Sequence, residues 1–170
     1  MKTLCRIALA MTCGIAPAAA QTFPSSAGNL SIETVASGLT NPWALAFLPD
    51  GRMLVTERPG RLRIVARDGK LSSVAGVPAV RASGQGGLHD VVLDRDFTRN
   101  KTIYLCYAEP ASGGGRTAMA RARLSDSETP KLDDVNVIFR QEGPLSSGNH
   151  YGCRIVQGRD GNLWLSLIHI

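Results

Sequence analysis

Short apolar runs separated by turn residues dominate the chain from Trp43 onward. The stretch WALAFLPDGRMLVTERPGRLRIVARDGKL alternates apolar pieces of five or six residues with turns at residues 49–51, 58–60 and 67–69. Pieces of that length, bounded by Asp-Gly and Pro-Gly, are typical of β-strands joined by hairpins. No stretch keeps its apolar residues at the helical spacing. The pattern therefore predicts an all-β protein.

One strand–turn–strand unit occurs three times. The copies are ALAFLPDGRMLVTE (44–57), DVVLDRDFTRNKTIYLCYAE (90–109) and RIVQGRDGNLWLSL (154–167). Their turn aspartates, Asp50, Asp96 and Asp160, are 46 and 64 residues apart. Propeller blades recur at about 40–50 residues, and loop insertions lengthen a spacing. We therefore predict a β-propeller in preference to a β-sandwich, which also has short strands and frequent turns.

The length holds only part of such a propeller. A propeller closes with about four to eight blades, and the residues after the first twenty supply roughly three. We expect residues 31–164 to be the N-terminal blades of a longer protein, inactive by themselves. Residues 165–170, LSLIHI, resemble one reading frame of a transposon-end adapter used in preparing DNA libraries, so His169 is not interpreted.

The first twenty residues form a separate segment. MKTLCRIALAMTCGIAPAAA has a basic start, an apolar run and a small-x-small site before Gln21. The run is too short to span a bilayer, and no acidic residue interrupts it. We expect a secretory signal peptide over residues 1–20, in preference to a buried helix, and a periplasmic or secreted protein. Residues 21–30, rich in Ser, Pro and Gly, are expected to form a flexible leader.

The charge distribution does not change the predicted class of protein. Without Lys2 and Arg6 the chain carries 17 basic and 14 acidic residues, scattered without runs or interleaved aromatics. This is an ordinary solvated surface, which argues against a nucleic-acid partner. We also expect no membrane span.

Two cysteines, Cys106 and Cys153, remain after the signal segment. Both adjoin apolar runs, and an oxidising compartment permits a bridge. Because each is placed in an expected strand, we favour two buried thiols and keep a disulfide as the alternative.

Three stretches, residues 38–65, 84–108 and 145–156, carry a specific resemblance when they are taken together. In order and spacing they resemble the soluble, quinone-dependent aldose sugar dehydrogenases of the glucose/sorbosone dehydrogenase family. The resemblance covers residues 38–164. It implies a six-bladed propeller with pyrroloquinoline quinone at its central mouth, which oxidises the C1 CH–OH of an aldose to a lactone. It also implies a soluble electron acceptor, and calcium with ligands beyond Trp164.

The resemblance gives His150, in LSSGNHYGCRIV, the position of the family's general base. A neutral imidazole can accept the proton of a sugar hydroxyl, and Gly148 and Gly152 leave room beside it. From the residues alone, a solvated turn histidine is the simpler interpretation.

Three further residues match positions that bind cofactor or substrate in the family. Gln85, in SGQGG, matches a glutamine whose amide both donates and accepts. Asn149 stands where members carry aspartate or asparagine. Arg154 matches an arginine at the strand start, which is either a ligand or a buried partner for an acidic group. Cys153 departs from the glycine of this pattern.

No metal site is predicted. We expect His89 to make a structural hydrogen bond. Asp94 and Asp96 are expected to bracket a turn, and with Asp90 they show no spacing that forces a calcium site.

An alternative function is a non-catalytic propeller that binds a protein or a glycan, since the fold alone does not choose. A lactone hydrolase would want a carboxylate-bound metal. Gln85 and His150, each in a matching context, favour the dehydrogenase.

Overall fold

The computed structural model describes residues 21–125, 127–144 and 146–167. By its contacts the chain divides into two units, Met1–Thr34 and Val35–Ile170. In the first unit, β1 (Gln21–Ser25) and β2 (Gly28–Ile32) form an antiparallel hairpin with every residue exposed. Most residues of the expected leader, 21–30, therefore lie in paired strands. The expected signal peptide, residues 1–20, lies outside the described residues.

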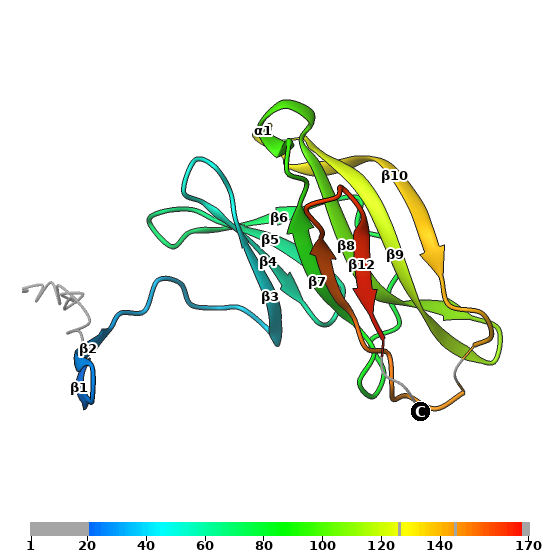
Figure 1. Cartoon of the computed structure of the whole chain (residues 1–170), viewed down its shortest axis with the longest axis horizontal. Helices are drawn as coiled ribbons and strands as arrows, with labels where there is room; N and C mark the ends of the chain where they lie inside the picture. The colour runs from blue at the N-terminus through cyan, green and yellow to red at the C-terminus, as the bar shows by residue number, and fades with distance from the viewer. Residues whose placement is uncertain (1–20, 126, 145, 168–170) are drawn as a thin grey trace, which may run out of the picture. The chain divides into compact units, whose positions relative to one another are not determined.

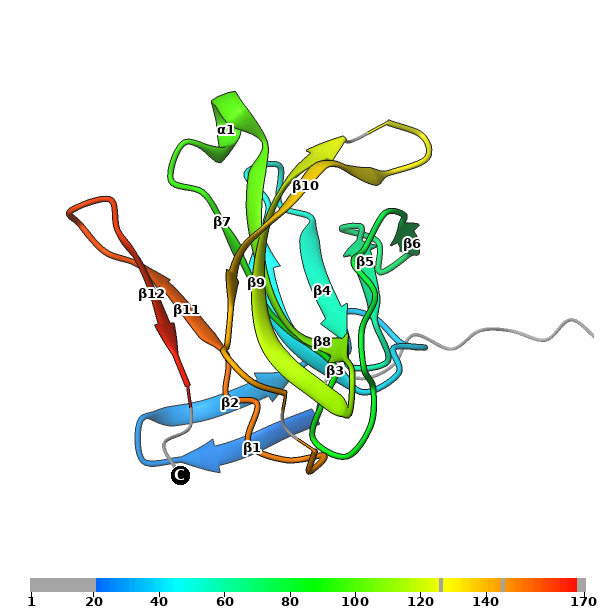
Figure 2. The same cartoon turned by 90° about the vertical axis from the view of Figure 1, so that its right-hand side faces the viewer.

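Three antiparallel sheets build the larger unit (Figures 1 and 2). The first contains, in spatial order, β3 (Pro42–Phe47), β4 (Met53–Glu57), β5 (Arg61–Val65) and β6 (Leu71–Val74). The second contains β7 (Leu88–Leu93), β8 (Thr102–Ala111), β9 (Gly114–Ser125) and β10 (Lys131–Arg140), with the one-turn helix α1 (Phe97–Asn100) between β7 and β8. The third contains β11 (Arg154–Gln157) and β12 (Leu163–Ser166). These are two four-stranded blades and the first two strands of a third, as the strand pattern predicted.

Each repeated unit of the sequence is the first two strands of a blade. The leading strands β3, β7 and β11 lie next to one another, with β7 in the middle. In the first and third turns, Asp50 and Asp160 accept the backbone N–H two residues on, at 2.9 and 3.1 Å. In the second turn Asp94 has this role toward Asp96, at 2.8 Å. A carboxylate that closes its own turn explains why an aspartate recurs there.

The second blade is buried on both faces. Along β8, Ile103, Leu105 and Tyr107 pack toward the first blade, whereas Tyr104 and Cys106 pack toward the third. A strand covered on both faces reads as a continuous apolar run, which is the pattern of IYLCYA. Burial of each large apolar side chain contributes about 1.5–3 kcal/mol, so these two layers hold the three sheets together.

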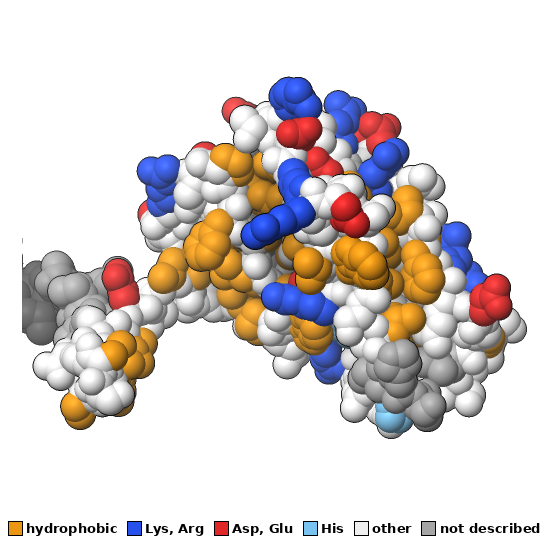
Figure 3. All heavy atoms as spheres, viewed as in Figure 1, with side chains coloured by type: hydrophobic (Ala, Val, Ile, Leu, Met, Phe, Trp, Pro, Cys, Tyr) orange, Lys and Arg blue, Asp and Glu red, His pale blue; other side chains and the backbone are white. Residues whose placement is uncertain are grey.

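Exposed apolar side chains gather on β3 of the first sheet and on the third sheet, and Figure 3 shows apolar patches on this side of the molecule. Phe47 on β3 is 71% exposed, and Trp164 on β12 is 61% exposed. In a propeller such faces pack against further blades. Within the described residues, no helix is long and apolar enough to cross a membrane.

A buried carboxylate fixes one end of the first blade. Glu57 is fully buried at the end of β4, and its Oε2 accepts the Nε–H groups of Arg61 and Arg63 at 2.6 and 2.9 Å. Its Oε1 accepts the backbone N–H of Thr40. Burial alone raises the pKa of Glu57, but these hydrogen bonds outweigh it and lower the pKa to about 2.

We expect this carboxylate to make the protein acid-sensitive. Because the folded-state pKa of Glu57 lies below its ordinary value, its stabilisation is complete above about pH 4.5 and is lost as the pH falls toward 2. The loss amounts to about 3 kcal/mol of unfolding free energy. Urea unfolding between pH 2.5 and 6 measures it. The Glu57→Gln variant should be less stable at pH 6, with a smaller decline over this range. An equally steep decline in that variant would contradict the assignment.

Candidate active site

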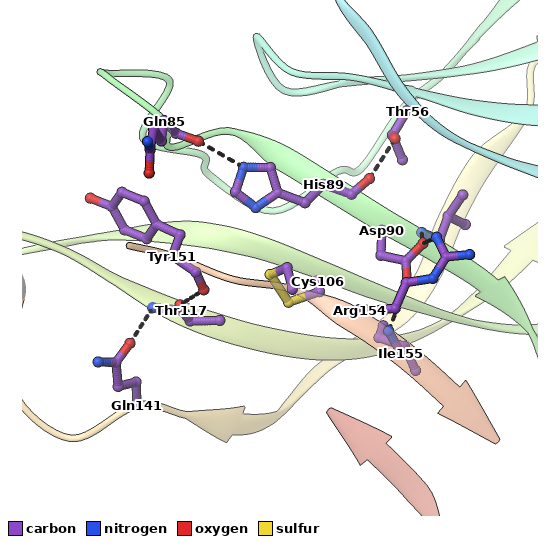
Figure 4. The surroundings of a disulfide bond; sticks show 12 residues. Thr56, Gln85, His89, Asp90, Cys106, Thr117, Gln141, Tyr151, Arg154 and Ile155 are labelled. Carbon is purple, nitrogen blue, oxygen red and sulfur yellow. Dashed lines mark hydrogen bonds and ion pairs between the residues drawn. A yellow bond between two sulfur atoms is a disulfide. The ribbon is translucent and has the colours of Figure 1, made fainter. Parts of the chain in front are cut away.

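A cavity of about 370 Å³ lies between the first two blades and the segment that leads into the third. Trp43 comes from β3, Arg58 follows β4, and His89 lies on β7. The remaining lining residues are Gln85, Tyr151 and Gly152. Figure 4 shows Gln85, His89 and Tyr151 close together at this place. Residues more than 100 positions apart in the chain thus share one cavity.

Gln85 connects the two loops at the cavity. Its backbone N–H donates to the Gly148 carbonyl at 2.7 Å, and its side-chain Oε1 accepts the His150 N–H at 3.0 Å. Because Oε1 faces this N–H, the NH₂ group is the part of the amide able to donate to a ligand. The structure therefore brings together Gln85 and the segment that carries His150, two of the residues singled out from the sequence.

Glycines at this junction allow close approach of backbone to backbone. A Cβ on Gly84 would lie 2.4 Å from the Gly148 oxygen, and a Cβ on Gly148 would lie 3.3 Å from the Gly84 Cα. The sequence suggested that Gly148 leaves room for a ligand. Its observed role is contact between the loops, whereas Gly152 does line the cavity.

His150 and Asn149 are both exposed. His150 has a backbone φ of 67°, in the left-handed region that residues with a Cβ seldom adopt. Neither side chain is part of the cavity wall in this structure, so the tie between His150 and the cavity runs through its backbone bond to Gln85.

His89 is 2% exposed and lies between the two aromatic rings of the cavity. Its ring centroid is 5.0 Å from that of Trp43 and 6.5 Å from that of Tyr151. Its Nε2 lies 3.0 Å from the Gln85 carbonyl oxygen, which can only accept, so Nε2 carries the proton. Burial lowers the pKa of His89, so the ring stays neutral at neutral pH. The expected structural hydrogen bond is confirmed, but sequence reasoning missed the place of His89 on the cavity wall.

Arg58 supports the Gln85 loop. Its Nη1 donates to the carbonyl oxygens of Gly84 and Gly86 at 2.7 and 3.2 Å. Its backbone carbonyl accepts the Leu88 N–H at 3.0 Å, which joins the loop to the end of the first blade. The guanidinium adds a positive charge beside the aromatic walls.

Arg154 pairs with an acid and lies outside the cavity wall. Its Nη1 is 3.4 Å from Oδ1 of the buried Asp90, while its own side chain is 68% exposed. Asp90 Oδ2 accepts the Ile155 N–H at 2.7 Å, and Oδ1 accepts the Val91 N–H at 3.0 Å. Asp90 thus ties β7 to β11. Arg154 is paired with an acid, as one of its two expected roles requires, but its own side chain is exposed and not buried as that role supposed. Among the described residues, no three His, Cys, Asp or Glu side chains gather as a metal site.

The expectation of two buried thiols was wrong. Cys106 on β8 and Cys153, just before β11, are both buried, but they form a disulfide with Cα atoms 5.8 Å apart. That spacing is ordinary for a bridge. The two positions become neighbours only when the second and third blades pack, and strand patterns do not measure such a distance.

Comparison with known proteins agrees with this arrangement. A model of the Glucose / Sorbosone dehydrogenase family matches residues 39–168. The chain belongs to the glucose/sorbosone dehydrogenase family. It is 45% identical over 141 residues to Aldose sugar dehydrogenase YliI of Escherichia coli (strain K12), covering 81% of this chain and 38% of that protein.

Solved structures extend the likeness to the fold. A glucose dehydrogenase crystal structure matches with 46% identity and a TM-score of 0.75, over 79% of this chain and 40% of that one. The PQQ-bound form of the aldose sugar dehydrogenase from Streptomyces coelicolor matches with 29% identity and a TM-score of 0.69, over 80% and 40%. This glucose/sorbosone dehydrogenase family member therefore spans about two fifths of the length of the relatives it matches.

Three cavity residues of this family member were missed at the sequence level: Trp43, Arg58 and Tyr151. Trp43 and Tyr151 each adjoin a residue with an obvious role, Pro42 at the strand start and His150. Apolar patterning assigns such aromatics to the core. Only the juxtaposition of β3, the Gln85 loop and the segment before β11 turns them into walls of a cavity.

Proposed function

We propose that the protein expressed from the complete gene is a periplasmic quinoprotein that oxidises aldoses at C1 to lactones. The proposal rests on one observation above all. In a member of a sugar dehydrogenase family, Gln85 is on the cavity wall and is hydrogen-bonded to the segment that carries His150. A histidine can accept the proton of a CH–OH group that is being oxidised, and an amide can orient the hydroxyl or the hydride acceptor by hydrogen bonds.

The cavity residues fit pyrroloquinoline quinone, a flat carboxylated ring system. Trp43 and Tyr151 offer aromatic surfaces, and Arg58 offers a cation for a carboxylate. The Gln85 NH₂ group can donate to a quinone oxygen. The quinone, when bound, supplies the acceptor for the hydride that leaves the sugar C1. The described residues contain no ligand set for calcium, and no step here depends on it.

His150 would accept the proton of the C1 hydroxyl. The hydrogen bond from the His150 N–H to Gln85 Oε1 fixes the backbone of His150. The position from which its side chain extends is therefore defined, next to the cavity residue Gln85. Proton removal by a positioned base contributes about 10²–10⁴-fold to a rate. The same Gln85 that contacts the cavity thus also places the base.

The cellular location is part of the proposal. Residues 1–20 have the pattern of a secretory signal. The Cys106–Cys153 disulfide supports an oxidising compartment, where such bonds persist. A soluble carrier would then collect the electrons.

Steady-state kinetics test the function. The protein, incubated with the quinone and calcium, should reduce a soluble dye when glucose or another aldose is added. A sugar alcohol without an aldehyde carbon should give no reaction. Omitting the quinone should abolish the activity. Aldose-independent dye reduction, or full activity without the quinone, would refute the proposal.

We expect Gln85→Ala to lower kcat/KM for aldoses by about 10- to 100-fold, because it removes a neutral hydrogen-bonding group and leaves its partners unpaired. Gln85→Glu is the matched control, since it keeps an oxygen that can accept the His150 N–H but removes the NH₂ donor. Similar losses in both variants would assign the effect to the donor. A loss of kcat/KM in Gln85→Ala but not in Gln85→Glu would assign the effect to the placement of His150. Wild-type kinetics in both would exclude a role for Gln85.

A further inference from the structure

The segment at residues 148–153 has a backbone that residues with side chains rarely adopt. His150 has a φ of 67°, and Cys153 has a φ of 122°. Values near 120° belong almost entirely to glycine, because a Cβ there collides with the neighbouring backbone. A cysteine stays in such a conformation only where its surroundings hold it.

Besides the hydrogen bond from the Gln85 N–H to the Gly148 carbonyl, four contacts of two kinds hold residues 150–153. The His150 N–H donates to Gln85 Oε1 at 3.0 Å, and the Cys153 N–H donates to the Ser166 carbonyl at 3.0 Å. The Thr117 hydroxyl donates to the Tyr151 carbonyl. The fourth contact is covalent, the disulfide from Cys153 to Cys106. Figure 4 shows the Thr117 contact and the bridge on the same side of the second blade.

The disulfide differs from the hydrogen bonds because water cannot replace it. Gln85 and His150 are exposed, so water can replace their hydrogen bond. The disulfide is buried, and its other end, Cys106, is anchored within β8 and fully covered. It is attached to the very residue whose backbone is least favourable. Without the bridge, the conformational free energy of Cys153 falls when its backbone leaves φ 122°. That movement starts three residues from His150.

We propose that the Cys106–Cys153 disulfide is a positioning device that holds the His150 segment in its left-handed conformation. Its importance for catalysis rests on the function proposed above for His150. Its effect on the segment does not. The bridge and the backbone strain can also be separated experimentally, because glycine takes φ 122° without cost.

Three variants separate them. Cys106→Ala removes the bridge and leaves Cys153 strained. Cys106→Ala/Cys153→Ala does the same without a free thiol. Cys106→Ala/Cys153→Gly removes the bridge and the strain together. All three lose the covalent link between the blades equally, so they differ only in what residue 153 prefers.

Hydrogen–deuterium exchange of the unliganded protein is the measurement, with peptides that cover Gln85 and residues 146–153. In Cys106→Ala and Cys106→Ala/Cys153→Ala, the alanine-series variants, the Gln85 and His150 amide hydrogens should exchange at least about tenfold faster than in the wild type. The glycine variant should remain within about threefold of it. A peptide over β4 and β5 should be unchanged in all, which separates local release from general loosening. In the quinone-loaded protein, kcat should fall in the alanine series and recover with glycine, with KM little changed.

Equal acceleration in all three variants would overturn the proposal, since the bridge would then only join the blades. Unchanged exchange in all three would also overturn it, because hydrogen bonds would suffice. If the alanine-series variants fail to fold, a folded glycine variant supports the proposal and an unfolded one contradicts it. Because exchange needs neither sugar nor quinone, failure of the proposed function leaves this test intact.

Discussion

Replacing His150 with alanine is expected to lower kcat for aldose oxidation by about 100- to 10,000-fold, the usual contribution of a positioned base. The backbone N–H of residue 150 still reaches Gln85 Oε1 in the variant, so the loop connection persists. Binding of the quinone should change far less than kcat, because the cavity wall contains Trp43, Arg58 and Gln85 but not the His150 side chain. Steady-state kinetics and a quinone titration measure the two effects separately.

Ser147→Ala is the matched control, because Ser147 is an exposed residue of the same loop. It should keep kcat within about twofold, as surface substitutions away from a functional contact do. If His150→Ala oxidised glucose at the wild-type rate, His150 would not be the base, and a solvated turn histidine would be the better interpretation.

The second large effect is on stability, at Asp90. Asp90→Ala should lower the free energy of unfolding by about 2–4 kcal/mol, because it leaves the buried N–H of Ile155 without its acceptor and Arg154 without its partner. The loss falls on the contact between β7 and β11. Urea unfolding of the purified protein at neutral pH measures it.

Two control substitutions test the cause of this loss of stability. Asp90→Asn keeps an oxygen for the Ile155 N–H and should cost about 1 kcal/mol. Asp96→Ala removes an exposed aspartate near the other end of β7 and should change stability by less than about 0.5 kcal/mol. Equal effects of Asp90→Ala and Asp96→Ala would show that the buried carboxylate does not join the blades.

The fold could be predicted because its units are local. Each strand–turn–strand copy contains its own apolar pairs and its own turn aspartate, so the repeat is visible along the chain. The continuous apolar run of β8 likewise reports a strand covered on both faces. The hairpin β1–β2 was missed because its residues are exposed and have no strand alternation to report.

The site was only partly predictable, because it depends on distances between blades. Gln85 and His150 stand in sequence motifs that are specific when they are taken together, so both could be singled out without a structure. The meeting of Gln85 with the His150 backbone, the aromatic walls from Trp43 and Tyr151, and the Cys106–Cys153 bridge all require β7, β8 and the start of β11 to be placed side by side. Arg154 shows the same limit, since its role depends on the position of Asp90.

The most direct measurement of the proposed function is an anaerobic single turnover. The protein is loaded with pyrroloquinoline quinone, an aldose is added without any other acceptor, and the quinone absorbance is followed. We expect the oxidised quinone spectrum to disappear in proportion to the sugar oxidised, and His150→Ala to slow this step by about 100-fold or more. An unchanged quinone spectrum in the presence of saturating aldose would contradict the proposed function.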